Sequence, residues 1–151
     1  VLSGDCGAGI DVLIGAVLIP GKEAPKVLDA THIKEMEEGG VFVDIAIDQG
    51  GCSETSRPTS HDNPTYFEEE VLHYCVTNMP GAYSRTATQA LNNVTTRWIS
   101  LLANSDLQTA CRNRPELLSG INCTGGKLTC APVGEAHSLS TVSPAEVLEL
   151  H

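Results

Sequence analysis

Three polar side chains of this 151-residue sequence could bind or transform a ligand. Asp48 supplies a carboxylate just before Gly50 and Gly51, two glycines that would let the backbone approach a ligand closely. Asn78 offers a carboxamide that both donates and accepts hydrogen bonds, and Arg57 offers a planar cation. Such residues are also common in turns and on solvated surfaces. Their types alone leave both a binding site and ordinary loops open.

Apolar runs predict the strands that position these residues. The runs at 11–19 and 41–47 are rich in branched side chains, as is typical of strands buried on both faces of a parallel sheet, and a third run lies at 71–76. Asp29 is placed to cap a helix over 30–37. Because the carboxyl ends of parallel strands share one edge, we expect Asp48 and Asn78 to line one crevice with the loop that ends the first run.

Two features of this first half need separate mention. Asp44 is a charged residue inside the run 41–47, and the sequence pattern does not explain it. Residues 48–64 are rich in Gly, Ser, Thr, Pro and Asn and predict a long loop, of the kind that is usually functional or disordered in compact domains. The alternation of strand, helix, strand, loop and strand predicts an α/β fold with a parallel sheet.

The second half has a different pattern. A helix is predicted over 84–104, because apolar residues recur there at helical spacing: Ala87, Ala90, Leu91, Val94, Trp98, Leu101 and Leu102. A shorter helix is expected at 106–112, a hairpin around Gly125 and Gly126, and a brief helix after Pro132. This half is too small to bury the apolar faces of its helices alone, so we expect it to pack against a further partner or segment.

Composition excludes several classes of function. The formal net charge of −10 argues against nucleic acid or an anionic membrane surface as a partner. No apolar run approaches the roughly 20 residues that span a bilayer. None of the six cysteines forms a C-x-x-C pair, so the sequence predicts no metal site. We also expect a cytoplasmic chain, in which the thiols stay reduced.

A glycine-rich segment at 4–9 is superficially similar to a dinucleotide fingerprint. Its glycines lack the G-x-G-x-x-G spacing, and it precedes a strand, whereas the fingerprint follows one. We interpret it as a leader or turn.

Three stretches of the sequence resemble the carboxyl-terminal part of the alanine dehydrogenase family, which is related to the pyridine nucleotide transhydrogenases. They are GAVLIPGKEAPKVL (15–28), VFVDIAIDQGGCSETSRPT (41–59) and HYCVTNMPGAYSRTATQALNN (73–93). The resemblance is close from residue 11 to about 120 and looser beyond. The transhydrogenase α subunit is similar around PGK and APK but differs at IDQGG and TNMP, so it is the weaker match.

This resemblance implies an NAD-dependent oxidoreductase that interconverts L-alanine with pyruvate and ammonia. It implies a catalytic role for Asp48, beside the nicotinamide. Thr77 stands where the family more often has Ala. The positions that match the family's NAD contacts are Val17, Leu18, Ile45, Ala46, Ile47, Asp48, Arg57, Val76, Thr77, Asn78 and Met79.

The resemblance also implies a domain organisation. Residues 1–83 would form the second half of a Rossmann-like NAD domain, and residues 84–151 the connecting helix and the carboxyl-terminal part of the substrate domain. The family's glycine fingerprint, catalytic Lys and catalytic His have no counterpart in this sequence. We therefore expect part of a longer enzyme, inactive alone, that binds NAD and L-alanine or pyruvate when complete and forms homo-oligomers, commonly hexamers in the family.

Two other interpretations stay open at this point. One is the NAD-binding domain of a transhydrogenase α subunit, which passes hydride between nicotinamides. The other is a truncated, non-catalytic interaction module, which would fold without NAD and bind a partner through the apolar face of the 84–104 helix.

Overall fold

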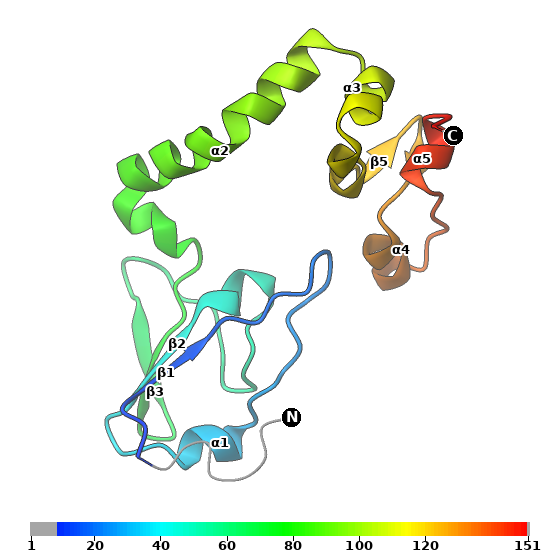
Figure 1. The fold of residues 1–151 in the computed structure, drawn as a ribbon. Coiled ribbons are helices and arrows are strands. Elements are labelled where there is room, and N and C mark those ends of the chain that lie inside the picture. The colour runs from blue at the N-terminus through cyan, green and yellow to red at the C-terminus, as the bar shows by residue number, and fades with distance from the viewer. Residues whose placement is uncertain (1–8, 151) are drawn as a thin grey trace. The chain divides into compact units, whose positions relative to one another are not determined.

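A computed structural model describes residues 9–150 of the chain. The glycine-rich segment at 4–9 therefore lies outside the described residues, apart from Gly9. The chain divides after Ala82 into two compact units (Figure 1).

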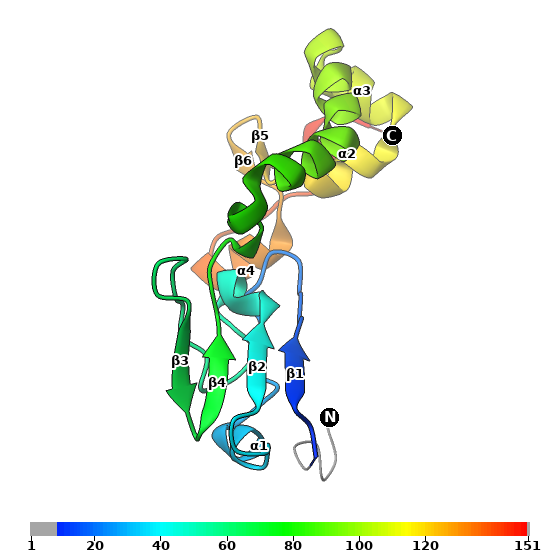
Figure 2. The ribbon, with the colours of Figure 1, turned by 90° about the vertical axis from the view of Figure 1, so that its left-hand side faces the viewer.

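The first unit is built on a four-stranded sheet with the order β1-β2-β4-β3 (Figure 2). The parallel strands are β1 (Val12–Gly15), β2 (Val41–Asp44) and β4 (Val71–Tyr74), and β3 (Thr65–Glu68) pairs antiparallel with β4. Helix α1 (Ala30–Lys34) begins after Asp29, whose carboxylate accepts hydrogen bonds from the backbone of Thr31 and His32. The predicted α/β fold with a parallel sheet is confirmed.

The strands are shorter than the apolar runs that predicted them. β2 ends at Asp44, and the 3-10 helix η1 (Ile45–Gln49) takes over the last part of the run. The physical reason is Asp44 itself, because its carboxylate accepts a hydrogen bond from the backbone N–H of Ala46 and so caps η1. The residue that the sequence pattern did not explain is the one that ends the strand.

The prediction that the first strand is buried on both faces is wrong for this chain. Val12 is 54% exposed and Ile14 is 60% exposed. β1 is the edge strand of the sheet, and its other face, carrying Leu13, packs against the core. The run 11–19 is apolar on both faces, yet among the described residues only one face is covered.

Strand β3 is not among the elements that the sequence pattern predicts. It forms a hairpin with β4 through Glu69 and Glu70, which have φ values of 49° and 61°. Two consecutive residues in the left-handed region are characteristic of a tight type I′ hairpin, where Asn and Gly are the usual residues. The Glu-Glu pair carries no such signal, so the hairpin could not be recognised.

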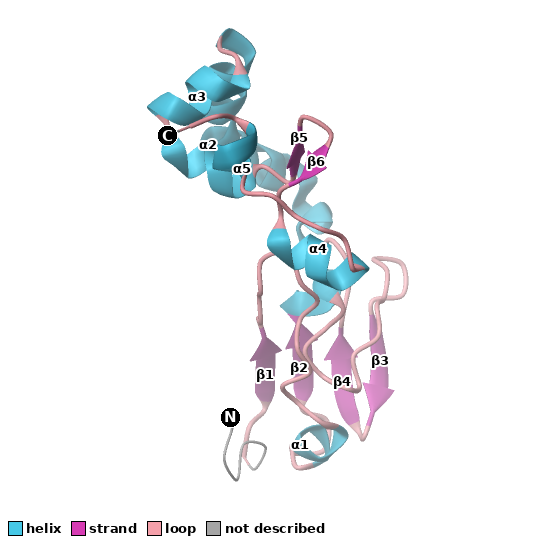
Figure 3. Cartoon of the chain, turned by 90° about the vertical axis from the view of Figure 1, so that its right-hand side faces the viewer, coloured by secondary structure: helices cyan, strands magenta, loops and turns pink. Residues whose placement is uncertain are grey.

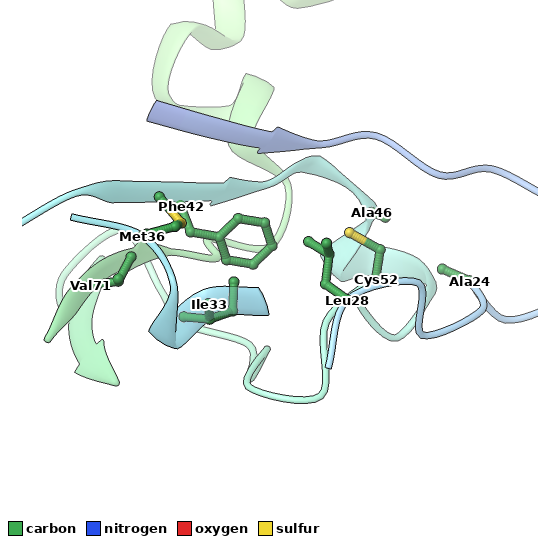
Figure 4. Close-up of a cluster of buried hydrophobic side chains, with 8 residues drawn as sticks. All are labelled: Ala24, Leu28, Ile33, Met36, Phe42, Ala46, Cys52 and Val71. Atoms are coloured by element: carbon green, nitrogen blue, oxygen red, sulfur yellow. The ribbon is translucent and has the colours of Figure 1, made fainter. Parts of the chain in front are cut away.

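The core of the first unit lies on one face of the sheet. In Figure 4 the Phe42 ring of β2 points toward Ile33 of α1 and Leu28. Phe42 and Ile33 are completely buried. The other buried members of this cluster are Ala24, Met36, Ala46, Cys52 and Val71.

The second unit is mainly helical (Figure 3). The long helix α2 (Ser84–Asn104) has the predicted bounds, and β5 (Cys123–Thr124) and β6 (Lys127–Leu128) form the predicted hairpin. The remaining elements are the 3-10 helices η2 (Met79–Tyr83), at the junction of the units, and η3 (Pro115–Gly120), and the helices α3 (Leu107–Asn113), α4 (Ala131–His137) and α5 (Pro144–Val147).

Helix α2 keeps its apolar side chains exposed. Leu91 is 61% exposed and Ile99 is 63% exposed, and no residue of the helix is buried. None of the helices in residues 9–150 is both long enough and apolar enough to cross a membrane.

Candidate functional site

The carboxyl edge of the parallel strands brings Asp48 and Asn78 into contact. Asp48 lies in η1, directly after β2, and Asn78 follows β4. The backbone N–H of Asn78 lies 3.1 Å and 3.3 Å from the two carboxylate oxygens of Asp48, and it donates to them. Both residues are exposed, so this edge presents a carboxylate and a residue with a carboxamide side chain to solvent.

The turn at Asn78 directs its N–H toward Asp48. Asn78 has a φ of 52°, in the left-handed region that Asn tolerates better than most residues. Its carbonyl oxygen accepts hydrogen bonds from Gly81 N at 2.8 Å and from His61 Nε2 at 3.1 Å. His61 therefore lies against the turn that carries Asn78.

Asp44 holds together the loop on which Asp48 lies. Its side chain is fully buried. One carboxylate oxygen accepts from Ala46 N at 2.9 Å and from Cys52 Sγ at 3.4 Å, and the other accepts from Cys52 N at 2.8 Å and from Ser56 Oγ at 2.5 Å. These bonds join the start of the loop after β2 to its later part, and they fix the position of Asp48 between them.

Lys26 fixes the Gly-Gly turn that follows Asp48. Its Nζ donates to the carbonyl oxygen of Gly50 at 2.6 Å and to that of Gly51 at 2.9 Å. The backbone N–H of Ala24 also donates to the carbonyl of Gln49 at 2.8 Å. The segment after β1 therefore reaches the loop after β2, as expected from the parallel arrangement of the two strands.

The predicted contact residues divide into exposed and buried side chains. Leu18 is 67% exposed and Ile45 is 52% exposed, whereas Ala46, Ile47 and Val76 are buried. A buried side chain cannot touch a ligand at the edge, so those three positions offer only their backbone. The others are partly buried or exposed: Val17 packs against the core, Thr77 donates its N–H to the carbonyl of Thr59, and Met79 begins η2.

Arg57 contacts Tyr66 rather than Asp48 or Asn78. Its guanidinium carbon lies 4.0 Å from the centre of the Tyr66 ring, in a cation–π arrangement. A groove of about 390 Å³ lies beside it, lined by Arg57, Pro58, Thr59, Ser60, Asn63, Thr65 and Tyr66. The sequence pattern did not single out Tyr66, because the strand that carries it was not predicted.

His73 is a fully buried histidine beneath this region. Its Nδ1 lies 2.9 Å from the carbonyl oxygen of Val71, which can only accept, so Nδ1 carries the proton. Its Nε2 lies 2.8 Å from Thr55 Oγ1 and accepts from that hydroxyl. Burial lowers the pKa of His73 from its ordinary value of 6.5, against smaller opposing effects of the Val71 carbonyl and the Glu68 carboxylate. The folded chain therefore holds a neutral imidazole.

This neutral histidine predicts a loss of stability at acidic pH. Because the folded pKa of His73 is lowered, the unfolded chain binds more protons below about pH 6.5, and the free energy of unfolding should fall there by up to about 1.4 kcal/mol per pH unit. The fall should level off once the folded chain also protonates. Urea titrations from pH 8 to pH 5 should show this slope in the wild type and a shallower slope in His73→Phe. Equal slopes in the two proteins would contradict it.

The cysteines in residues 9–150 are all free. Burial raises the pKa of the Cys52 thiol to about 12, with a further contribution from the negative charge of Asp44. Such a thiol stays protonated and unreactive at neutral pH. Within the described residues, no cluster of three or more His, Cys, Asp and Glu side chains is arranged to hold a metal ion.

These features define the class of the first unit. Its parallel strands β1, β2 and β4 end in polar loops at one edge, and the two loops after β2 and β4 meet through Asp48 and Asn78. This is a Rossmann-like part of an α/β protein, in which ligands bind at the carboxyl ends of the strands.

Comparisons with known proteins agree with this class. The family model for alanine dehydrogenase/PNT, C-terminal domain, matches residues 5–131. The chain therefore belongs to the alanine dehydrogenase/PNT family, and the sequence resemblance is confirmed. The Halomonas elongata alanine dehydrogenase is 48% identical over 138 residues, and that of Methanococcus maripaludis is 48% identical over 137 residues.

A solved structure of an L-alanine dehydrogenase superposes with a TM-score of 0.70 and 47% identity, over 85% of this chain. The chain spans only part of its relatives. The alignments cover 91% of this chain but 37% of the Halomonas protein, 90% but 36% of the Methanococcus protein, and 35% of the solved structure.

Proposed function

We propose that this chain supplies the nicotinamide side of the NAD site in an enzyme that interconverts L-alanine with pyruvate and ammonia. The observation that carries the proposal is the contact between Asp48 and Asn78 at the carboxyl edge of the parallel sheet. The family and the high identity to alanine dehydrogenases support it. The transhydrogenase alternative lacks comparable support, because the relatives at 45–48% identity are alanine dehydrogenases.

The residues at the edge suit a nicotinamide ring with its carboxamide. Leu18 and Ile45 expose apolar surface that can pack on a flat ring, and Gly50 has open space around its α-carbon. Asn78 has a side-chain amide suited to hydrogen bonds with another carboxamide. When bound, NAD supplies the hydride-accepting ring. The chain orients that ring and excludes water from its apolar side.

Asp48 would act through its negative charge and its position. A carboxylate next to the ring stabilises the positive charge of the oxidised nicotinamide, and it can hold a proton near the substrate's nitrogen. The hydrogen bonds from Asn78 keep the carboxylate oriented before any ligand binds. Asp44 and Lys26 hold the loop on which Asp48 lies, so little reorganisation is needed.

The domain roles extend this proposal. Residues 1–83 would act as the second half of the NAD domain and residues 84–151 as the connecting helix and part of the substrate domain. We further propose that the complete enzyme works in the cytoplasm as a homo-oligomer, such as a hexamer. The free cysteines of residues 9–150 fit a reducing compartment.

The alternative of a non-catalytic interaction module is favoured only by the exposed apolar face of α2.

A hybrid enzyme tests the proposed function. The carboxyl-terminal part of the Halomonas elongata alanine dehydrogenase is replaced by this chain, which is 48% identical to it. We expect the hybrid to reduce NAD in the presence of L-alanine, whereas the 151-residue chain alone should not. Asp48→Asn should lower kcat by about 100-fold or more, as loss of an acid–base or charge-stabilising group does.

The matched control is Asp62→Asn, an exposed aspartate outside the groove and the edge, which should leave kcat unchanged. A folded hybrid that does not oxidise alanine would contradict the proposal. So would an Asp48→Asn hybrid as active as the parent. Activity of the isolated chain would overturn the expectation that it is incomplete.

A further inference from the structure

A row of side chains crosses the core face of the sheet at paired positions of the strands. The register pairs Leu13 with Phe42, Phe42 with His73, and His73 with Tyr66. The Phe42 and His73 rings meet edge to face with centres 5.2 Å apart. The His73 and Tyr66 rings stack at 4.9 Å with an angle of 28°. Tyr66 is thus supported from the buried core, although it belongs to the edge strand β3.

Arg57 lies over Tyr66, the last side chain of this row. The Arg57 guanidinium covers the Tyr66 ring at 4.0 Å, and the Arg57 backbone N–H donates to the Tyr66 hydroxyl at 2.9 Å. That hydroxyl in turn donates to the carbonyl oxygen of Thr55 at 2.8 Å. A guanidinium stacked on a ring keeps its N–H donors in its own plane. They therefore remain available to a ligand in the groove that Arg57 lines.

Thr55 is held from two sides. Its hydroxyl donates to His73 Nε2, and its carbonyl accepts from Tyr66. Ser53 Oγ lies 2.9 Å from the same hydroxyl and accepts the Thr55 N–H at 3.2 Å. The segment that leads to Arg57 is therefore anchored to a buried imidazole and to the tyrosine beneath the guanidinium. The Tyr66 hydroxyl bonds the backbone of both Thr55 and Arg57, the two neighbours of Ser56. Packing of the core would not by itself require these two hydrogen bonds.

We propose that Tyr66, stacked on His73, is a positioning residue that holds Arg57 ready to bind the dinucleotide. The proposal rests on the proposed function, because it assigns Arg57 a cofactor contact. Tyr66 acts in two ways: its ring fixes the guanidinium plane, and its hydroxyl fixes the backbone of residues 55–57. Arg57 then loses little freedom when the ligand binds.

The first test needs no ligand. In the 151-residue chain, the heteronuclear NOE of the Arg57 Nε–H group measures its mobility on the fast timescale. We expect an ordered signal in the wild type and a mobile one in Tyr66→Leu, whereas Tyr66→Phe keeps the ring and should keep the guanidinium ordered. The control is Tyr74→Leu, a tyrosine on the opposite face of the same hairpin. Equal order in the wild type and Tyr66→Leu would overturn the proposal.

The second test is the affinity for NADH, measured by titration of the hybrid enzyme with and without the same substitutions. Arg57→Ala and Tyr66→Leu should both weaken binding, Tyr66→Leu by about threefold to tenfold, as expected for loss of an exposed cation–π contact and its hydrogen bond. Tyr74→Leu should bind as the wild type does. If Arg57→Ala weakens binding and Tyr66→Leu does not, the positioning role is wrong and the proposed function stands. If the hybrid without these substitutions does not bind NADH, the proposed cofactor site itself fails, while the NOE still decides whether Tyr66 orders Arg57.

Discussion

Asp44→Ala should lower the free energy of unfolding by about 3–5 kcal/mol. The fully buried carboxylate accepts hydrogen bonds from the backbone N–H groups of Ala46 and Cys52, and alanine would leave both donors without this partner. Each buried donor left unsatisfied costs about 1–3 kcal/mol. The Ser56 hydroxyl would lose its acceptor as well. Asp44→Asn should cost less, because one oxygen remains as an acceptor.

Urea titration at neutral pH measures this change, with Asp62→Ala as the control. Asp62 is exposed, so its loss should change the free energy of unfolding by less than about 0.5 kcal/mol. Hydrogen exchange gives a local readout, since the Cys52 amide should exchange much faster in Asp44→Ala. A loss below about 1 kcal/mol in that variant would show that the loop is held by other contacts.

The effect should extend to function because Asp44 and Asp48 share one short helix. Asp44 caps η1 and Asp48 lies four residues later in it. Without the cap, η1 loses the hydrogen bond that starts it, and the Asp48 carboxylate loses its fixed position next to Asn78. The two aspartates thus divide their roles: one is buried and structural, and the other is exposed and faces the ligand.

The sequence predicted the elements whose signals are local. The spacing of apolar residues predicted α2 with its observed bounds, and the branched runs predicted three parallel strands. The meeting of Asp48 with Asn78 also followed, since parallel strands carry their loops to the same edge. Periodicity acts over short stretches of chain, whereas the topological rule brings together loops 30 residues apart without requiring knowledge of any side-chain partner.

The missed features depend on contacts between distant residues. Lys26 bonds carbonyls 24 and 25 residues away, and His73 bonds a hydroxyl 18 residues away. The sequence around a lysine or a histidine does not indicate which distant residue its side chain will bond. The burial of β1 was overestimated for a related reason. The apolar pattern shows that both faces of the strand carry apolar side chains, but it does not show which segment of the chain packs on each face.

Gly51→Ala should be the other strongly destabilising change, with a loss of about 2–5 kcal/mol. Gly51 has a φ of 78°, a left-handed conformation that costs other residues about 1–2 kcal/mol. A Cβ atom there would also lie 2.7 Å from the Ser56 Cβ and 2.9 Å from an Asp44 carboxylate oxygen. Relieving such overlap adds about 1–3 kcal/mol. The added methyl group therefore meets the same carboxylate that holds the loop.

Gly50→Ala separates these two costs. Gly50 also has a positive φ, 98°, but a Cβ at this position would meet nothing within 4 Å. It should therefore show only the backbone cost, about 1–2 kcal/mol. Urea titrations of both variants measure the difference, and equal losses would show that the contact with Asp44 and Ser56 relaxes freely. A larger loss for Gly51→Ala would mean that this loop has one packed arrangement, in which the glycine, the buried carboxylate and the exposed Asp48 depend on one another.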